Sequence, residues 1–399
     1  MMRDNVRADN RRNRWLTASD REGSRIEVGD GMKTVCLAAG LVAIGAVIGI
    51  GARSQESRTT PAAWDARLAA SYLDSRQAWW LQWPNAARDH DTTCVSCHTS
   101  LPYALARSAL RTALKETAVA GPEQVLVERV SKRVRLWKDV DPFYPDQKNG
   151  LPKTSESRGT EAVLNALVLA TRDAAQGRSS EEGRAALEHM WALQFRAGDL
   201  SGAWAWLNFR YEPWESNDAP FFGATLAAIA VGTAPSDGPP GADLAARYTA
   251  LRDYLRKGIA NQSLFNRTML LWASTRWAGV VEPAERQSIV DALWSRQSAD
   301  GGWSLSSLGQ WTRRDGSALE TASDGYATGL VALALREAGS PAAEPHVARA
   351  LAWLVANQDR QSGRWPAWSL NKNRDAASDV GKFMSDAATA FAVLALTRQ

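Results

Sequence analysis

The chain has 399 residues, of which 45% are hydrophobic and 23% are charged, with 18 Trp and only 3 Cys. These values exclude a disordered tail, a collagen-like fibre and a small disulfide-rich scaffold. The formal net charge is +4, and because the basic residues form no stripe, no nucleic-acid partner is expected.

The N-terminal region is expected to direct export. Residues 1–33 are rich in Arg and are expected to be disordered or to precede a true start at Met32. Residues 34–52 contain no charged side chain and are long enough to span a bilayer or to form a signal peptide. Because the basic residues precede this segment, the positive-inside rule predicts that everything after it is exported, to the periplasm. A membrane anchor through residues 34–52 and a cleaved signal are both open, with residues 53–60 as a linker.

Two kinds of helical segment alternate in the predicted domain, residues 61–399. One kind is amphipathic, with apolar residues three and four positions apart, as in Leu126, Val130 and Val134. The other kind is rich in small residues and apolar on most sides, which predicts a helix buried all round. Amphipathic helices are expected near 62–80, 122–138, 180–194, 243–258, 283–297 and 343–357. Buried helices are expected at 104–106, 162–170, 224–231, 268–274, 328–335 and 389–396.

The regular alternation of the two helix types predicts the fold. Six amphipathic and six buried helices indicate an all-α (α/α)6 toroid, in which an outer ring of helices surrounds an inner ring. An open helical solenoid and two small bundles are the alternatives. The links that lead from an outer to an inner helix are mostly long and carry aromatic and charged residues. That end of the toroid is therefore the expected working face.

The first of these links contains the sharpest chemical motif, Cys94-Val95-Ser96-Cys97-His98. This is the c-type haem attachment pattern, in which Cys94 and Cys97 form thioether bonds to haem c and His98 binds the iron. Attachment takes place outside the cytoplasm, which agrees with export and implies the haem maturation machinery as a partner. A zinc site formed by His90, Cys94, Cys97 and His98 is one alternative, and a Cys94–Cys97 disulfide is another.

The same order of Gln, Gly and Trp follows three amphipathic segments. The copies are Gln194-Gly202-Trp204, Gln297-Gly301-Trp303 and Gln358-Gly363-Trp365. They match the QW repeat, so residues 60–399 resemble the toroid family of squalene-hopene cyclases and other terpene cyclases. The resemblance implies the toroid fold far more strongly than an activity, and it also implies a cavity for a hydrophobic, isoprenoid-like ligand.

Cyclisation in that family implies a DxDD acid motif at the start of an inner helix. The nearest counterparts here are Asp324 in Asp-Gly-Tyr-Ala-Thr-Gly and Asp386 in Ser-Asp-Ala-Ala-Thr-Ala. Each keeps a single carboxylate and lacks the paired neighbours that hold one carboxyl group protonated. Both residues are therefore expected to cap inner helices. A cyclase that uses Asp324 or Asp386 as a non-standard acid is the alternative.

Closure of the toroid suggests the sixth iron ligand. If the last inner helix neighbours the first, Met384 lies at the same height as His98, and its thioether is a candidate for the sixth iron ligand. His90 and an open coordination position are the alternatives. The sequence thus predicts an exported haem c protein that acts in redox chemistry. It would transfer electrons to an unidentified redox partner or act as a haem-dependent oxidoreductase. A non-catalytic binding or electron-relay module is a further alternative.

Overall fold

The computed structural model describes residues 63–236 and 238–398. The predicted basic segment, apolar segment and linker, which together cover residues 1–60, lie outside the described residues. Among the helices that are described, none is both long enough and apolar enough to cross a membrane. The described part is all-α apart from one two-stranded hairpin, which confirms the predicted class.

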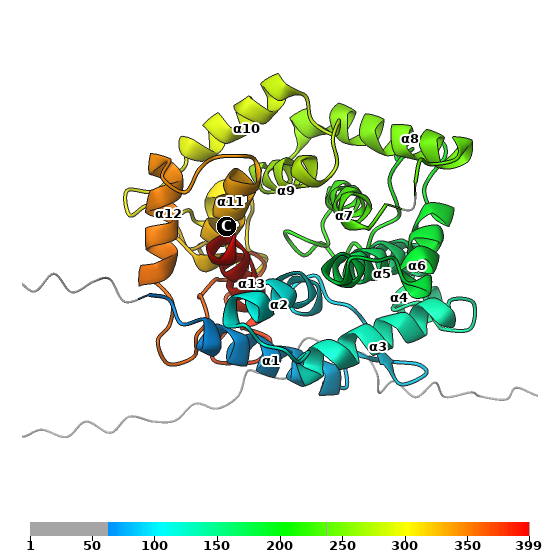
Figure 1. The fold of residues 1–399 in the computed structure, drawn as a ribbon, viewed down its shortest axis with the longest axis horizontal. Helices are drawn as coiled ribbons and strands as arrows, with labels where there is room; N and C mark the ends of the chain where they lie inside the picture. The colour runs from blue at the N-terminus through cyan, green and yellow to red at the C-terminus, as the bar shows by residue number, and fades with distance from the viewer. Residues whose placement is uncertain (1–62, 237, 399) are drawn as a thin grey trace, which may run out of the picture. The chain divides into compact units, whose positions relative to one another are not determined.

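Six helices form the buried centre of the domain (Figure 1). They are α2 (Ser100–Leu114), α5 (Lys153–Gln176), α7 (Ala219–Thr233), α9 (Leu264–Arg276), α11 (Gly325–Glu337) and α13 (Phe383–Thr397). Each contacts the next in this order, and α13 contacts α2 again. Small residues allow the close approach: a Cβ atom on Gly329 of α11 would lie only 2.6 Å from the backbone nitrogen of Ala392 in α13.

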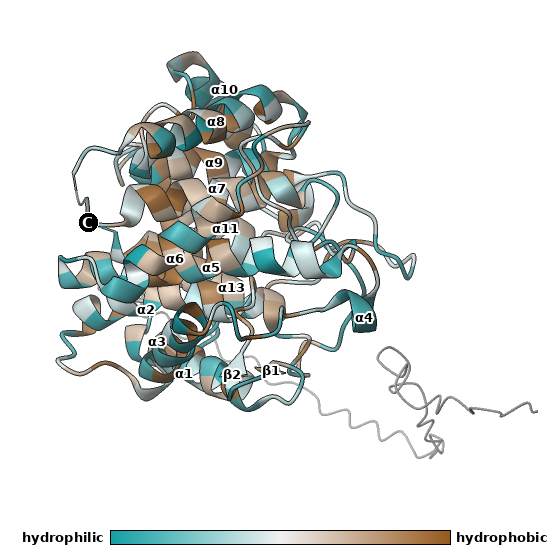
Figure 2. Cartoon of the chain, turned by 90° about the vertical axis from the view of Figure 1, so that its right-hand side faces the viewer, coloured by the Kyte–Doolittle hydropathy of each residue, from teal (hydrophilic) through white to brown (hydrophobic). Residues whose placement is uncertain are grey.

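Six further helices surround this centre (Figure 1). They are α1 (Ala66–Gln82), α3 (Gly121–Arg135), α6 (Glu181–Ala192), α8 (Ala242–Gly258), α10 (Pro283–Trp294) and α12 (Pro345–Ala356). Each is amphipathic: in α12, for example, Val347, Ala350 and Leu354 are buried against the centre. Figure 2 shows the hydrophobic residues concentrated in the central helices. All twelve predicted helices are therefore present, and the inner ones extend well beyond the predicted ranges: α5, for example, runs over Lys153–Gln176 where 162–170 was expected.

The shorter elements lie in the links. The 3-10 helix η1 (Ile259–Asn261) joins α8 almost directly to α9, while η2 (Leu305–Leu308) and α4 (Asp146–Asn149) lie in longer links. Strands β1 (Ala87–Arg88) and β2 (Thr92–Thr93) pair antiparallel between α1 and α2. The sequence pattern did not predict this hairpin, because strands of two residues show no periodicity.

Each Gln–Trp turn ties one outer helix to the next. The Gln358 side-chain amide donates to the carbonyl oxygens of Gly363 and Asp65, and its oxygen accepts from the Asp65 backbone N–H. Because Asp65 caps α1, this turn joins the last outer helix to the first. The other two amides donate in the same way, Gln297 to Gly301 and His346, and Gln194 to Gly202 and Arg247.

The long outer-to-inner links are joined to one another. The side chain of Asn371 exchanges two hydrogen bonds with the backbone of Glu212, which lies in the link between α6 and α7. The carbonyl of Asn371 also accepts from the backbone N–H of Arg314, in the link between α10 and α11. Three links thus form one connected layer at the N-terminal ends of the inner helices. This is the end at which the sequence predicts the working face.

Candidate functional site

The Cys-Val-Ser-Cys-His segment is held firmly between the hairpin and α2. The indole of Trp80 donates to the carbonyl oxygen of Cys94 at 2.9 Å, and the Cys94 N–H donates to the carbonyl of Ala86 at 3.0 Å. At the other end, the hydroxyl of Ser96 accepts from the backbone N–H groups of Thr99 and its neighbour at the start of α2. A serine inside the motif therefore satisfies two backbone N–H groups at the start of the first inner helix and fixes the motif's orientation on it.

The two cysteines are buried, separate thiols. Cys94 and Cys97 are not joined in a disulfide, and burial raises the pKa of both thiol groups. His90 lies in the exposed hairpin turn, where its Nδ1 atom is 3.1 Å from Asp89. Within the described part of the chain, no three His, Cys, Asp or Glu side chains converge in a metal-binding arrangement. Zinc ligation and a Cys94–Cys97 disulfide stay the alternatives to haem attachment.

His98 is half-buried among aromatic rings. Phe383 stacks on its imidazole with ring centroids 3.8 Å apart, and Trp80 meets it edge-on at 5.1 Å. Burial lowers the pKa of His98 to about 3, and the positive charges of Arg76 and Arg374 act in the same direction. The imidazole is therefore neutral. Its Nδ1 atom is 2.8 Å from the Thr99 hydroxyl, and its Nε2 atom has no hydrogen-bond partner among the described residues.

This donor set fits a covalently bound haem. Two separate thiols with two intervening residues precede an imidazole whose Nε2 atom is available for a metal. The surroundings are also suitable, because large aromatic side chains provide apolar faces for a porphyrin. Those packed around Cys94 are Trp79, Trp80, Trp83, Phe143, Tyr144 and Phe383.

Glu215 is a second ionisable group in this neighbourhood. It follows Trp214, whose ring lies 5.9 Å from that of His98, and its backbone exchanges two hydrogen bonds with Tyr211. Its negative charge contributes to the raised pKa of both motif cysteines. Burial raises the pKa of Glu215 itself from 4.5 to about 7. Sequence analysis missed this residue, although its place in an aromatic outer-to-inner link was a signal.

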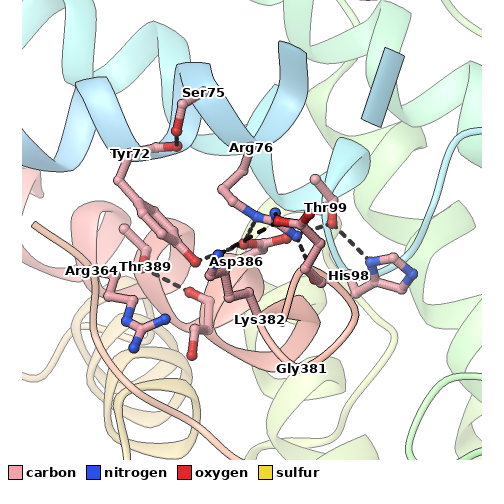
Figure 3. Close-up of polar contacts among 12 residues, drawn as sticks. Tyr72, Ser75, Arg76, His98, Thr99, Arg364, Gly381, Lys382, Asp386 and Thr389 are labelled. Carbon is pink, nitrogen blue, oxygen red and sulfur yellow. Dashed lines mark hydrogen bonds and ion pairs between the residues drawn. The ribbon is translucent and has the colours of Figure 1, made fainter. Parts of the chain in front are cut away.

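Asp386 corrects a prediction. It was expected to cap the last inner helix, but α13 begins at Phe383, so Asp386 lies inside the first turn. Its carboxylate instead accepts from the Tyr72 hydroxyl and the Arg76 Nε at 2.8 Å each, and from the Thr99 hydroxyl at 2.7 Å (Figure 3). Burial raises the pKa of this carboxyl while Arg76 acts in the opposite direction. A carboxylate held by a guanidinium is a poor candidate for the strong acid that a cyclase needs.

Asp324 is the predicted helix cap. It precedes α11, and its carboxylate accepts from the backbone N–H groups of Tyr326 at 2.8 Å and Ala327 at 2.9 Å, and also from that of Leu305. Burial raises the pKa of Asp324 to about 7. Its partners are backbone groups of a link and of a helix start, as expected for a helix cap.

The candidates for the sixth iron ligand lie in different places. Met384 is buried in the first turn of α13, and α13 contacts α2 as the argument for Met384 required. The ring that stacks on His98, however, belongs to the preceding residue, Phe383. His90 is exposed on the hairpin. Ligation by Met384 or by His90 stays a prediction.

Comparisons with known proteins identify no family. No protein-family model matches the sequence, and no curated protein matches it. Among solved structures, a wild-type glycosidase has a TM-score of 0.46 and 14% identity, covering 83% of this chain and 97% of that chain. A glycosidase variant has a TM-score of 0.46, 13% identity and the same coverage. Similarity this low says nothing about the activity of this chain.

Proposed function

We propose that this chain is an exported c-type haem protein built on an (α/α)6 toroid, and that it acts in redox chemistry. The observation that carries the proposal is the state of the Cys-Val-Ser-Cys-His segment. It presents two separate thiols and, at the start of α2, an imidazole whose Nε2 atom has no partner among residues 63–236 and 238–398.

The toroid interpretation is supported by two features of the described helices. The inner helices contact one another in an order that returns from α13 to α2. The outer helices are joined in the same sense, because the Gln358 turn bonds to Asp65 at the start of α1. An open solenoid would leave its first and last helices without these contacts.

The residues of the chain have distinct roles in this proposal. Cys94 and Cys97 would hold the haem through thioether bonds, and His98 would bind the iron through Nε2. When bound, the haem supplies a one-electron couple between ferric and ferrous iron. Phe383, stacked at 3.8 Å, and Trp80, edge-on at 5.1 Å, hold the plane of the His98 imidazole. The layer of links joined by Asn371 lies at the same end of the inner helices.

The sixth coordination position decides between two forms of the redox function. Ligation by Met384 or His90 would make the protein an electron carrier with an unidentified redox partner, whereas an open position would suit oxidoreduction of a substrate. Carbon monoxide binding to the ferrous protein separates them. Rapid binding without denaturant indicates an open iron, and binding that becomes rapid only in Met384→Ala or His90→Ala identifies the ligand.

A hydrophobic ligand is part of the proposal only through the resemblance to terpene cyclases. A cavity of about 480 Å³ between α2, α3 and α5 is lined by apolar side chains, among them Ala104, Leu126 and Val168, together with polar and charged ones such as Arg111 and Glu123. It is separate from the Cys-Val-Ser-Cys-His segment. Anchoring to the membrane through residues 34–52 and delivery to the haem maturation machinery are likewise proposals, because those residues lie outside the described part.

The decisive experiment is a pyridine haemochrome spectrum. The full chain is expressed with its N-terminal segment in a host that carries a haem-attachment system, and the spectrum of the purified protein is recorded. The proposal predicts the spectrum of a haem with two thioether links. Cys94→Ala with Cys97→Ala should abolish it, while Asp324→Asn, a matched change away from the motif, should retain it. Wild-type protein without haem would overturn the redox assignment.

A further inference from the structure

A chain of hydrogen bonds connects His98 to a buried carboxylate on the last inner helix (Figure 3). The His98 Nδ1 atom lies 2.8 Å from the Thr99 hydroxyl oxygen, and that hydroxyl lies 2.7 Å from Asp386. Thr99 is 2% exposed and Asp386 is 1% exposed. This series of hydrogen bonds therefore runs through the protein interior, where hydrogen bonds to a charge are strong.

The partners of Asp386 determine the direction of these hydrogen bonds. One carboxylate oxygen accepts from the Arg76 guanidinium and from the Tyr72 hydroxyl, and the other is 2.7 Å from the Thr99 hydroxyl. All three of these partners donate to Asp386, so its two carboxyl oxygens act as acceptors. The single hydroxyl proton of Thr99 therefore points to Asp386, and the Thr99 oxygen accepts from His98 Nδ1–H.

This direction fixes the tautomer of His98. With the proton on Nδ1, the lone pair is on Nε2, the atom without a partner among the described residues. A strong acceptor beyond Nδ1–H also draws the proton away from the ring, which increases the electron density that Nε2 can donate. A more strongly donating ligand stabilises ferric over ferrous iron.

We propose that Thr99 and Asp386 are positioning residues that hold His98 as the Nδ1–H tautomer and lower the reduction potential of the haem. This inference rests on the proposed haem attachment. Arg76 anchors the arrangement, because it also pairs with Asp379 at 2.8 Å and so fixes the carboxylate between α1 and α13. The hydrogen bond joins a threonine at the start of α2 to a residue 287 positions away in α13.

The test is a reductive titration of the loaded protein followed through its haem absorbance. Thr99→Val keeps the side-chain shape and the net charge, and it leaves Asp386 bonded to Arg76 and Tyr72. We expect it to shift the ferric-to-ferrous equilibrium about tenfold toward ferrous iron, a rise of about 59 mV for a one-electron couple. Thr99→Ser retains the hydroxyl and should keep the wild-type potential.

Two further variants separate this role from general stability. Tyr72→Phe removes a competing donor from Asp386 and should shift the potential in the opposite direction, because the carboxylate then pulls more strongly on Thr99. Thr389→Val removes another fully buried hydroxyl of α13, which bonds to Trp365 and Ser385. It should lower stability without moving the potential.

The outcomes distinguish this inference from the function on which it rests. Haem content is measured first, and wild-type protein without haem overturns the proposed function. If the wild type carries haem but Thr99→Val and Thr99→Ser both titrate at the wild-type potential, the positioning role is wrong and the haem assignment stands. An equal shift in Thr389→Val would also refute the role, because the effect would then follow from loosened packing.

Discussion

Replacing Gln358 by Ala tests how the ring of outer helices closes. The side chain is 3% exposed and makes three hydrogen bonds, two to Asp65 and one to Gly363. Each bond contributes about 1 kcal/mol, and a buried group left without a partner costs about 1–3 kcal/mol. Because water can reach part of the α1 terminus once the side chain is gone, we expect a loss of about 2–4 kcal/mol in the free energy of unfolding.

The assay for this prediction is urea unfolding followed by circular dichroism. Gln361→Ala is the matched control, because Gln361 lies in the same turn but is exposed and its side chain has no hydrogen-bond partner among the described residues. The control should stay within about 0.5 kcal/mol of the wild type. Hydrogen exchange in the first turn of α1 should accelerate in Gln358→Ala alone. If Gln358→Ala is as stable as the control, the turn does not close the ring.

Three other perturbations test separate parts of the structure. Gly301→Ala should lower the melting temperature more than Gly177→Ala. Both glycines have a positive φ, but only at Gly301 would the new Cβ lie 2.9 Å from the backbone of Arg349. Equal losses in melting temperature would contradict the packing of the turn. In chemical denaturation, Asp324→Ala should lower the free energy of unfolding by about 1–2 kcal/mol. Asp324→Asn should lower it less, because Asn can still cap α11. Equal losses in the two variants would exclude capping. The pKa of Glu215 is raised from 4.5 to about 7, so the folded state binds this proton more tightly and the melting temperature of the haem-free protein should fall as pH rises between these values. Glu215→Gln should remove that part of the pH dependence, and an unchanged profile would show that Glu215 does not titrate in this range.

The helices could be predicted because burial leaves a clear record in the sequence. A segment such as Phe221 to Ala230 has no polar face, so its burial on all sides follows directly. The Gln–Trp turns could also be predicted, since Gln358, Gly363 and Trp365 keep the same order as in the other copies. The hairpin could not be predicted, because its strands Ala87–Arg88 and Thr92–Thr93 are too short to show an alternation of polar and apolar residues.

The site could be predicted only in part, because its motif is local and its surroundings are not. Cys94, Cys97 and His98 are adjacent in sequence and therefore recognisable. Asp386 was misassigned because α13 starts earlier than expected: its cap is Lys382, four residues before Asp386, which places the Asp386 carboxyl group inside the first turn. Its partner Arg76 lies 310 positions earlier, and no local pattern connects the two.

The most direct test of the account is the intact mass of the exported, purified chain. The account predicts a mass that exceeds the polypeptide by one haem and that persists after acid denaturation, because thioether bonds survive it. Cys94→Ala with Cys97→Ala should have the mass of the polypeptide alone. A wild-type chain with no added mass, after maturation in a host that loads a known c-type cytochrome in parallel, would contradict the central claim.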